Sequence, residues 1–245
     1  MEFENAVEIK NVEMHFNMSK EKLESLKEYF LRLVTRKLMF EDFVAINDVS
    51  FNIKKGDVFG LVGLNGSGKS TMLKIISGIL TPTKGTVQTI GSIAPLIELG
   101  AGFDMDLTAR ENIYLNGSVL GYSKKFMDEK FDEIVEFSEM RDFLDTPMKN
   151  YSSGMVARIG FAIATMTKPD ILIVDEILAV GDFRFQEKCE ARINEMINND
   201  DTTVIIVSHS IEQIERLCKH CAWLEKGHLK MIGDAKDVCE AYKNS

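Results

Sequence analysis

The stretch GLNGSGKST, residues 63–71, decides the fold class. It fits the pattern G-x-x-x-x-G-K-[ST], and it lies between an apolar segment, DVFGLVG (57–63), and a helix-like segment, STMLKIISGI (70–79). Glycines let the backbone wrap around a polyphosphate so that its N–H groups point inward, and the following helix adds its partial positive charge. The stretch therefore predicts a P-loop nucleotide site in an α/β fold.

Within this stretch the side chains have separable roles. We expect Lys69 to reach the β and γ phosphates, and Ser70 to offer its hydroxyl to Mg²⁺ with Thr71 beside it. A glycine- and serine-rich turn can be no more than a turn, but here a lysine and two hydroxyls follow it in register. The residues assigned to the site are Gly63, Leu64, Asn65, Gly66, Ser67, Gly68, Lys69, Ser70 and Thr71.

Two further segments end in polar residues after apolar runs. ILIVDE (171–176) ends in Asp175 and Glu176, and TVIIV (203–207) is followed by His209. Such runs suit parallel strands covered on both faces, whose carboxyl ends form the ligand-binding edge of an open sheet. We expect Asp175 to hold Mg²⁺ through water, Glu176 to polarise the attacking water, and His209 to contact that water or the γ-phosphate. The alternatives are a helix N-cap for the acidic pair and a structural histidine.

The rest of the chain predicts one α/β domain with a mostly helical insert. The patterns indicate strands near 6–16 and 44–53, a helical region from about 106 to 168, and a helix over 185–198. CAWLEKGHLKMIG (221–233) is typical of a hairpin with Lys226-Gly227 at its turn, before a short C-terminal helix.

Composition excludes several classes of protein. The formal charge of -9 argues against sequence-blind binding to nucleic acid, and no apolar run is long enough to span a membrane. The four cysteines lie in the last quarter of the chain. Because Cys218 and Cys221 have no second pair at matching spacing, reduced structural thiols are favoured over a metal site.

The segment YSSGM, residues 151–155, resembles the signature sequence Leu-Ser-Gly-Gly-Gln of ATP-binding cassette (ABC) ATPases. In that family two subunits pack head to tail, and the signature of one caps the γ-phosphate bound by the other. Ser152 would supply a hydroxyl, Ser153 and Gly154 backbone N–H groups, and the helix beginning there its dipole. A plain serine N-cap is the alternative.

APLIELGAGF, LTARENIYLNG and VDEILAVGDFRFQEKC, together with the signature segment, resemble the ATPase subunits of bacterial ABC exporters for O-antigen, capsular polysaccharide and teichoic acid. The resemblance implies a single ABC ATPase domain over 1–245, with a RecA-like core, an antiparallel β subdomain and a helical subdomain at about 106–168. It also implies that Asp182 is the D-loop aspartate at the dimer interface. If the chain ends at Ser245, no C-terminal carbohydrate-binding domain is expected.

Four positions depart from the family pattern. Glu98 stands where the Q-loop glutamine would contact Mg²⁺, and a carboxylate can keep that role. Phe16 stands where a tyrosine usually stacks on adenine, with Phe43 as a competitor. Met155 replaces the signature glutamine, and Ser153 replaces its first glycine.

The resemblance implies a homodimer beneath two copies of a membrane permease subunit, bound peripherally at the cytoplasmic face and exporting a polysaccharide or lipid-linked polymer. An amphipathic, basic helix is expected at about 18–40, where six Lys/Arg accompany three Glu in residues 19–38. It would contact the permease or anionic headgroups, or else lie solvated on the surface. The rival functions are a non-transport ABC ATPase and a metabolic P-loop kinase.

Overall fold

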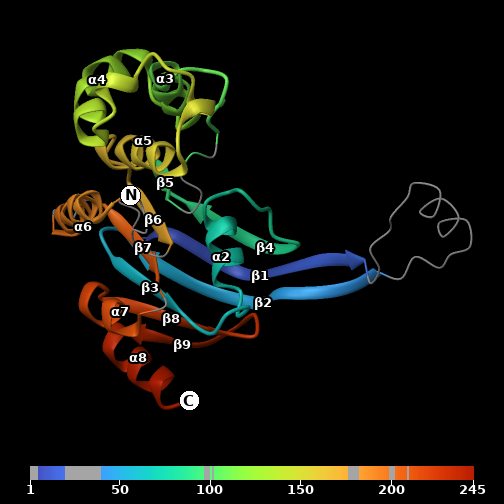
Figure 1. The fold of residues 1–245 in the computed structure, drawn as a ribbon. Coiled ribbons are helices and arrows are strands. Elements are labelled where there is room, and N and C mark those ends of the chain that lie inside the picture. Colours follow the sequence, from blue (N-terminus) through green and yellow to red (C-terminus); the bar gives the residue numbers. More distant parts are fainter. Residues whose placement is uncertain are drawn as a thin grey trace, which may run out of the picture.

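A computed structural model describes residues 5–19, 40–96, 100, 102–175, 182–198, 202–208 and 210–245, and gives the backbone alone for Met18, Ser19, Phe40, Glu41 and Asp175. Figure 1 shows the fold. Its strands are β1 (Asn5–Ser19), β2 (Phe40–Lys54), β3 (Val58–Val62), β4 (Lys84–Thr89), β5 (Ile93–Pro95), β6 (Ile171–Asp175), β7 (Thr203–Val207), β8 (His220–Glu225) and β9 (His228–Asp234). Its helices are α2 (Lys69–Ile76), α3 (Ala109–Val119), α4 (Lys124–Ser138), α5 (Ser153–Met166), α6 (Phe183–Asn198), α7 (Ile211–Leu217) and α8 (Ala235–Lys243), with 3₁₀ turns at Arg141–Phe143 and Met148–Asn150.

The strands form two sheets. One is antiparallel with the order β2-β1-β4, and the other has the order β5-β6-β7-β3-β8-β9 and is parallel except for the β8–β9 hairpin. The strand with the phosphate loop at its end, β3, lies between β7 and β8 at the centre of the second sheet. Parallel neighbours bring their carboxyl ends to one edge, so this order positions the candidate site.

Alternate residues of β3 point into two different cores. Phe59 and Leu61 pack with α2 and the antiparallel sheet, whereas Val58 and Val62 face the core formed with α5, α6, α7 and α8. Both faces of β3 are thus covered, which explains why its sequence is apolar without a break. The first core holds α2 against both sheets and so fixes where the phosphate loop meets its helix.

Helices α3, α4 and α5 form a separate cluster with their own core, which we call the helical cluster. In Figure 1 it lies at the opposite end of the molecule from α7 and α8. Buried Asn112 ties the preceding loop to α3: its amide nitrogen donates to the carbonyl oxygens of Asp104, Leu107 and Thr108, and its amide oxygen accepts from the N–H of Asp104. These bonds fix the direction in which the chain enters the cluster.

The strands and helices expected from the sequence are confirmed, except for the basic helix at about 18–40, whose described ends, residues 18–19 and 40, are strand. The turn between β8 and β9 contains Lys226 and Gly227 with φ of 48° and 80°, as a two-residue hairpin turn requires. Strands β1 and β2 pair as far as Ser19 and Phe40. The basic helix expected at about 18–40 falls mainly on residues 20–39, outside the described residues.

The structure also describes the state of the cysteines and the lengths of the helices. All four cysteines are free and buried, and burial raises the pKa of Cys189 to about 12. Among the described helices, none has the length and apolarity needed to cross a bilayer.

Candidate nucleotide site

The phosphate loop is shaped by three glycines with positive φ. Gly63, Gly66 and Gly68 have φ of 147°, 78° and 105°, a region that residues with a Cβ rarely enter. Gly68 is also the N-cap of α2, so Lys69, Ser70 and Thr71 form its first turn. The N–H groups of such a turn have no acceptor within the helix and point toward any anion placed before it.

The loop packs so closely on its surroundings that two of its glycines leave no room for a side chain. A Cβ on Gly63 would lie 2.2 Å from the carbonyl oxygen of Leu224 and 2.6 Å from Ser67 Oγ. A Cβ on Gly68 would lie 2.6 Å from Ile46 Cδ1. The buried Ser67 Oγ has no hydrogen-bond partner among the described residues. A bare backbone cradle with an unpaired hydroxyl fits a phosphate group.

The side chain of Lys69 crosses this loop. Its Nζ atom donates to the carbonyl oxygens of Gly63 at 2.6 Å and Leu64 at 3.0 Å, and the residue is only 6% exposed. An ammonium group held over a loop of inward N–H groups is positioned for phosphate oxygens. The remaining loop residue with a large side chain, Leu64, is exposed.

The strand register brings the backbone of Asp175 to the edge of the sheet that carries the phosphate loop. Asp175 of β6 pairs with Val207 of β7, and Val207 pairs with Leu61 of β3, two residues before Gly63. The backbone of Asp175 therefore lies in one row with the strand that leads into the phosphate loop. The side chain of Asp175 and all of Glu176, His209 and Glu98 lie outside the described parts, so their roles stay predictions.

The signature segment begins α5. Ser152 is its N-cap, and its Oγ accepts a hydrogen bond from the N–H of Met155 at 3.2 Å. Ser152 and Ser153 are exposed, and Gly154 is partly exposed. Capping uses one lone pair of the Ser152 hydroxyl and leaves its proton and second lone pair for another partner. The N-cap alternative is therefore compatible with binding an anion.

Phe16 and Phe43 are register partners on neighbouring strands. Phe16 is partly buried and packs against the core below α2, whereas Phe43 is 45% exposed. Both rings belong to the antiparallel sheet, so each stays a candidate for stacking on adenine.

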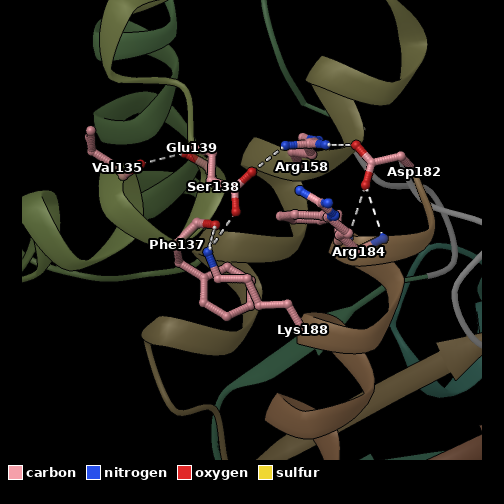
Figure 2. Close-up of polar contacts among 9 residues, drawn as sticks. Val135, Phe137, Ser138, Glu139, Arg158, Asp182, Arg184 and Lys188 are labelled. Atoms are coloured by element: carbon pink, nitrogen blue, oxygen red, sulfur yellow. Dashed lines mark hydrogen bonds and ion pairs between the residues drawn. The ribbon is translucent and has the colours of Figure 1, made fainter.

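Asp182 has partners within its own chain. Its Oδ1 atom accepts from the N–H groups of Arg184 and Phe185, and its Oδ2 atom forms an ion pair with Arg158 (Figure 2). The bond from Phe185 is the largest cause of a lowered pKa for Asp182. Sequence analysis missed Arg158. The available signal was a charged residue directly before an uncharged, mostly apolar run, IGFAIATM (159–166), which the structure buries throughout.

An apolar cavity of about 290 Å³ lies between the helical cluster and the parallel sheet. Its lining includes Pro95 of β5, Phe103, and Gly160 of α5. Ile79 and Val119 also line it while remaining 48% and 67% exposed. These two side chains extend the apolar lining of the cavity to the surface of the protein.

Comparison with known proteins supplies the family. Residues 46–179, more than half of the chain, match the family described as ABC transporter. The chain belongs to this family. This ABC transporter ATPase subunit is 45% identical to the O-antigen export system ATP-binding protein RfbB of Klebsiella pneumoniae, over 83% of this chain and 82% of that one. It is 40% identical to the teichoic acids export ATP-binding protein TagH of Lactiplantibacillus plantarum, over 99% of this chain and 66% of that one.

Solved structures agree on the fold of the ABC subunit. An ATP-binding subunit of an ABC transporter matches with a TM-score of 0.74 at 20% identity, covering 97% of this chain and 93% of that chain. An ATP-binding cassette solved as a dimer in a post-hydrolysis state, with ADP and phosphate bound, matches with a TM-score of 0.72 at 23% identity, covering 94% and 98%. The expected α/β ABC-type fold is confirmed, and the family match shows that the cassette binds ATP.

Proposed function

We propose that this ABC ATPase subunit powers export of a cell-surface polysaccharide, of the O-antigen, capsule or teichoic acid type, through a separate membrane subunit. The identity of 40–45% to ATP-binding proteins named for O-antigen and teichoic acids export supports the proposal. On this proposal the chain is peripheral at the cytoplasmic face of the membrane, as a homodimer beneath two copies of the permease.

The exposed start of α5 is the observation that supports the proposed dimer. One chain has two anion-binding elements: the phosphate loop, and the N-terminus of α5 with Ser152 and Ser153 open to solvent. We infer that each ATP lies between the phosphate loop of one subunit and Ser152, Ser153 and Gly154 of the other. Bound ATP then holds the two subunits together in an arrangement that we call the clamp, and hydrolysis loosens it.

We infer the catalytic roles of three side chains from their places in the sequence. Lys69 and the first turn of α2 hold the phosphates, Glu176 orients the attacking water, and His209 stabilises charge on the γ-phosphate. Mg²⁺ would be held by Ser70, Asp175 and Glu98, whose hard oxygen donors suit it, and it would neutralise phosphate charge.

The permease needs a docking surface. We assign it to the apolar cavity between the helical cluster and the sheet, because an apolar segment of a membrane subunit would cover Ile79 and Val119 there. Displacement of the helical cluster during the ATP cycle would then reach the permease through this contact.

Charge placed at the start of α5 tests the clamp. In a Glu176→Gln background, which blocks hydrolysis, we expect ATP to convert the chain to dimers in light scattering. Adding Ser152→Asp keeps the helix cap but sets a carboxylate against the partner's γ-phosphate, so dimers should be lost while ATP binding remains. Ser123→Asp is the matched control, because Ser123 caps α4 in the same way.

The result that contradicts the clamp is a chain that stays monomeric with ATP in the Glu176→Gln background, even with its permease. Equal dimerisation of the Ser152→Asp and Ser123→Asp variants would also contradict it. The cargo is tested by deleting the gene and staining cells for surface polysaccharide. Unchanged polysaccharide would remove the export proposal and leave the ATPase assignment in place.

A further inference from the structure

Arg158 joins three elements that are distant in the sequence. It lies on α5, and its guanidinium donates to Glu139 Oε2 at 2.8 Å through one nitrogen and pairs with Asp182 Oδ2 through another (Figure 2). Glu139 ends α4 and Asp182 immediately precedes α6. A single side chain thus ties the helical cluster to a helix that packs on the parallel sheet.

Arg158 is buried more deeply than its two carboxylate partners, which are 52% and 64% exposed. The side chain is only 14% exposed, and its guanidinium lies 4.5 Å from the centre of the Phe185 ring. Partial removal from water strengthens both the cation–π contact and the ion pairs. Two carboxylates and one aromatic face hold the guanidinium in a single orientation.

Both oxygens of Asp182 are engaged within the chain. Oδ1 caps the first turn of α6 and Oδ2 pairs with Arg158, although the side chain is 64% exposed. The D-loop role implied for Asp182 by the family resemblance is a contact with the other subunit. In the structure its carboxylate instead links α5 to α6.

Glu139 is held from a second side by α6. Lys188 Nζ donates to Glu139 Oε1 at 3.1 Å and to the carbonyl oxygen of Phe137 at 2.8 Å. Glu139 itself has a φ of 61°, which gives α4 a left-handed C-cap. The pair of bridges from Arg158 and Lys188 therefore fixes the end of α4 against the start of α6.

We propose that Arg158 is a positioning residue for ATP hydrolysis. It locks Ser152, at the tip of its own helix, to Asp182, so that the two segments facing the other subunit move as one unit. The six residues from Ser152 to Arg158 span about 9 Å of helix, short enough to transmit a shift at Asp182 to the clamp without bending. This proposal rests on the clamped dimer proposed above.

Three variants separate this role from simple stabilisation. Arg158→Gln keeps the length of the side chain and removes its charge. Asp182→Asn removes the ion pair but keeps the cap on α6, since asparagine caps as well as aspartate. Arg110→Gln is the matched control, because Arg110 also pairs with an aspartate, Asp145, and lies over a phenylalanine ring, yet stays within the helical cluster.

For Arg158→Gln we expect kcat for ATP hydrolysis by the full chain to fall roughly ten- to a hundredfold, as small misplacements of catalytic elements do. The Kd for ATP should change less than about threefold, because the phosphate loop is untouched. Arg158→Lys keeps the charge but loses the planar guanidinium that contacts both carboxylates, so it should recover part of kcat. Asp182→Asn should reproduce the loss, and the double variant should be no worse than either single variant.

A kcat for Arg158→Gln within twofold of wild type, as expected for Arg110→Gln, would overturn the proposal. So would losses that multiply in the double variant, since the two residues would then act independently. A thermal unfolding scan of each variant accompanies the kinetics. If Arg158→Gln and Arg158→Lys both unfold at the wild-type temperature and Arg158→Lys recovers none of the lost kcat, that result also counts against the proposal. If the wild-type chain fails to dimerise with ATP in the Glu176→Gln background, the clamp itself has failed instead.

Discussion

The Nζ atom of Lys69 lies 2.6 Å from the carbonyl oxygen of Gly63, so the lysine proposed to bind phosphate is anchored to the first residue of its own loop. Replacing it with methionine removes a charged donor from the nucleotide. We expect Lys69→Met to weaken ATP binding roughly 10- to 100-fold, since a hydrogen bond to a charged group contributes about 1.5–3 kcal/mol. Lys74→Met, in the last turn of the same helix, should leave the Kd within about twofold. Calorimetric titration with ATP measures both, and equal effects would contradict the assignment of Lys69.

The glycines of the phosphate loop differ in what a methyl group would meet. At Gly63 it would collide with the carbonyl oxygen of Leu224 and with Ser67, whereas at Gly66 nothing lies within 4 Å. We expect Gly63→Ala to lower the free energy of unfolding by about 2–4 kcal/mol and to abolish ATP binding. Gly66→Ala, which carries backbone strain without a clash, should cost about 1 kcal/mol. Urea denaturation ranks the two, and the reverse order would show that the loop does not hold this shape.

The features predictable from the sequence are those set by local chemistry. The phosphate loop requires glycine at positive φ, and a two-residue hairpin requires Lys226 and Gly227 with φ above zero, so their positions can be inferred from a few neighbouring residues. The apolar runs at 171–174 and 203–207 likewise identify buried strands, because covering both faces of a sheet excludes polar residues.

The contacts that sequence analysis missed depend on the tertiary arrangement. Arg158 meets Glu139 and Asp182, which lie 19 and 24 residues away along the chain. Nothing in the local pattern selects these two carboxylates from the 38 acidic residues. The place of β3 between β7 and β8 is equally non-local, since parallel pairing leaves no turn signal between neighbours.

His15 gives the paired strands β1 and β2 a stability that depends on pH. Its Nδ1 atom lies 2.9 Å from Asp42 Oδ2 and its Nε2 atom 3.2 Å from Glu13 Oε2. The bond with Asp42, followed by that with Glu13, raises the pKa of His15 above its ordinary value. A pKa raised by folding stabilises the native state fully below about pH 6.5, and this stabilisation is lost as the pH rises through the raised value.

We therefore expect His15→Asn to lower the free energy of unfolding at pH 6 and to have little effect at pH 9. Urea denaturation of the wild type and the variant across this range measures the difference. Lys84 also pairs with Glu13, at 2.9 Å, and this contact is present in both the wild type and the variant, so their difference reports on His15. A difference that is constant with pH, or larger at pH 9, would show that the two carboxylates do not hold a protonated His15.

Val119 tests whether the apolar cavity receives the permease. Its side chain is 67% exposed beside the cavity, so Val119→Glu adds a charge without disturbing a core. ATP binding and the ATPase rate of the isolated subunit should be unchanged, because Val119 ends α3 and belongs to neither the phosphate loop nor the start of α5. Burying the carboxylate against an apolar partner costs several kcal/mol, so export of polysaccharide should fall at least about tenfold.

Ile232→Glu is the matched control, since Ile232 is an exposed hydrophobic residue of β9, far from the helical cluster in Figure 1. Co-purification of the permease with each variant separates a docking defect from a defect in the ATP cycle. Loss of the permease from Val119→Glu alone is the expected result. If both variants retain the permease and export normally, the membrane subunit docks on another surface, and the cavity has to be explained by packing between the helical cluster and the sheet.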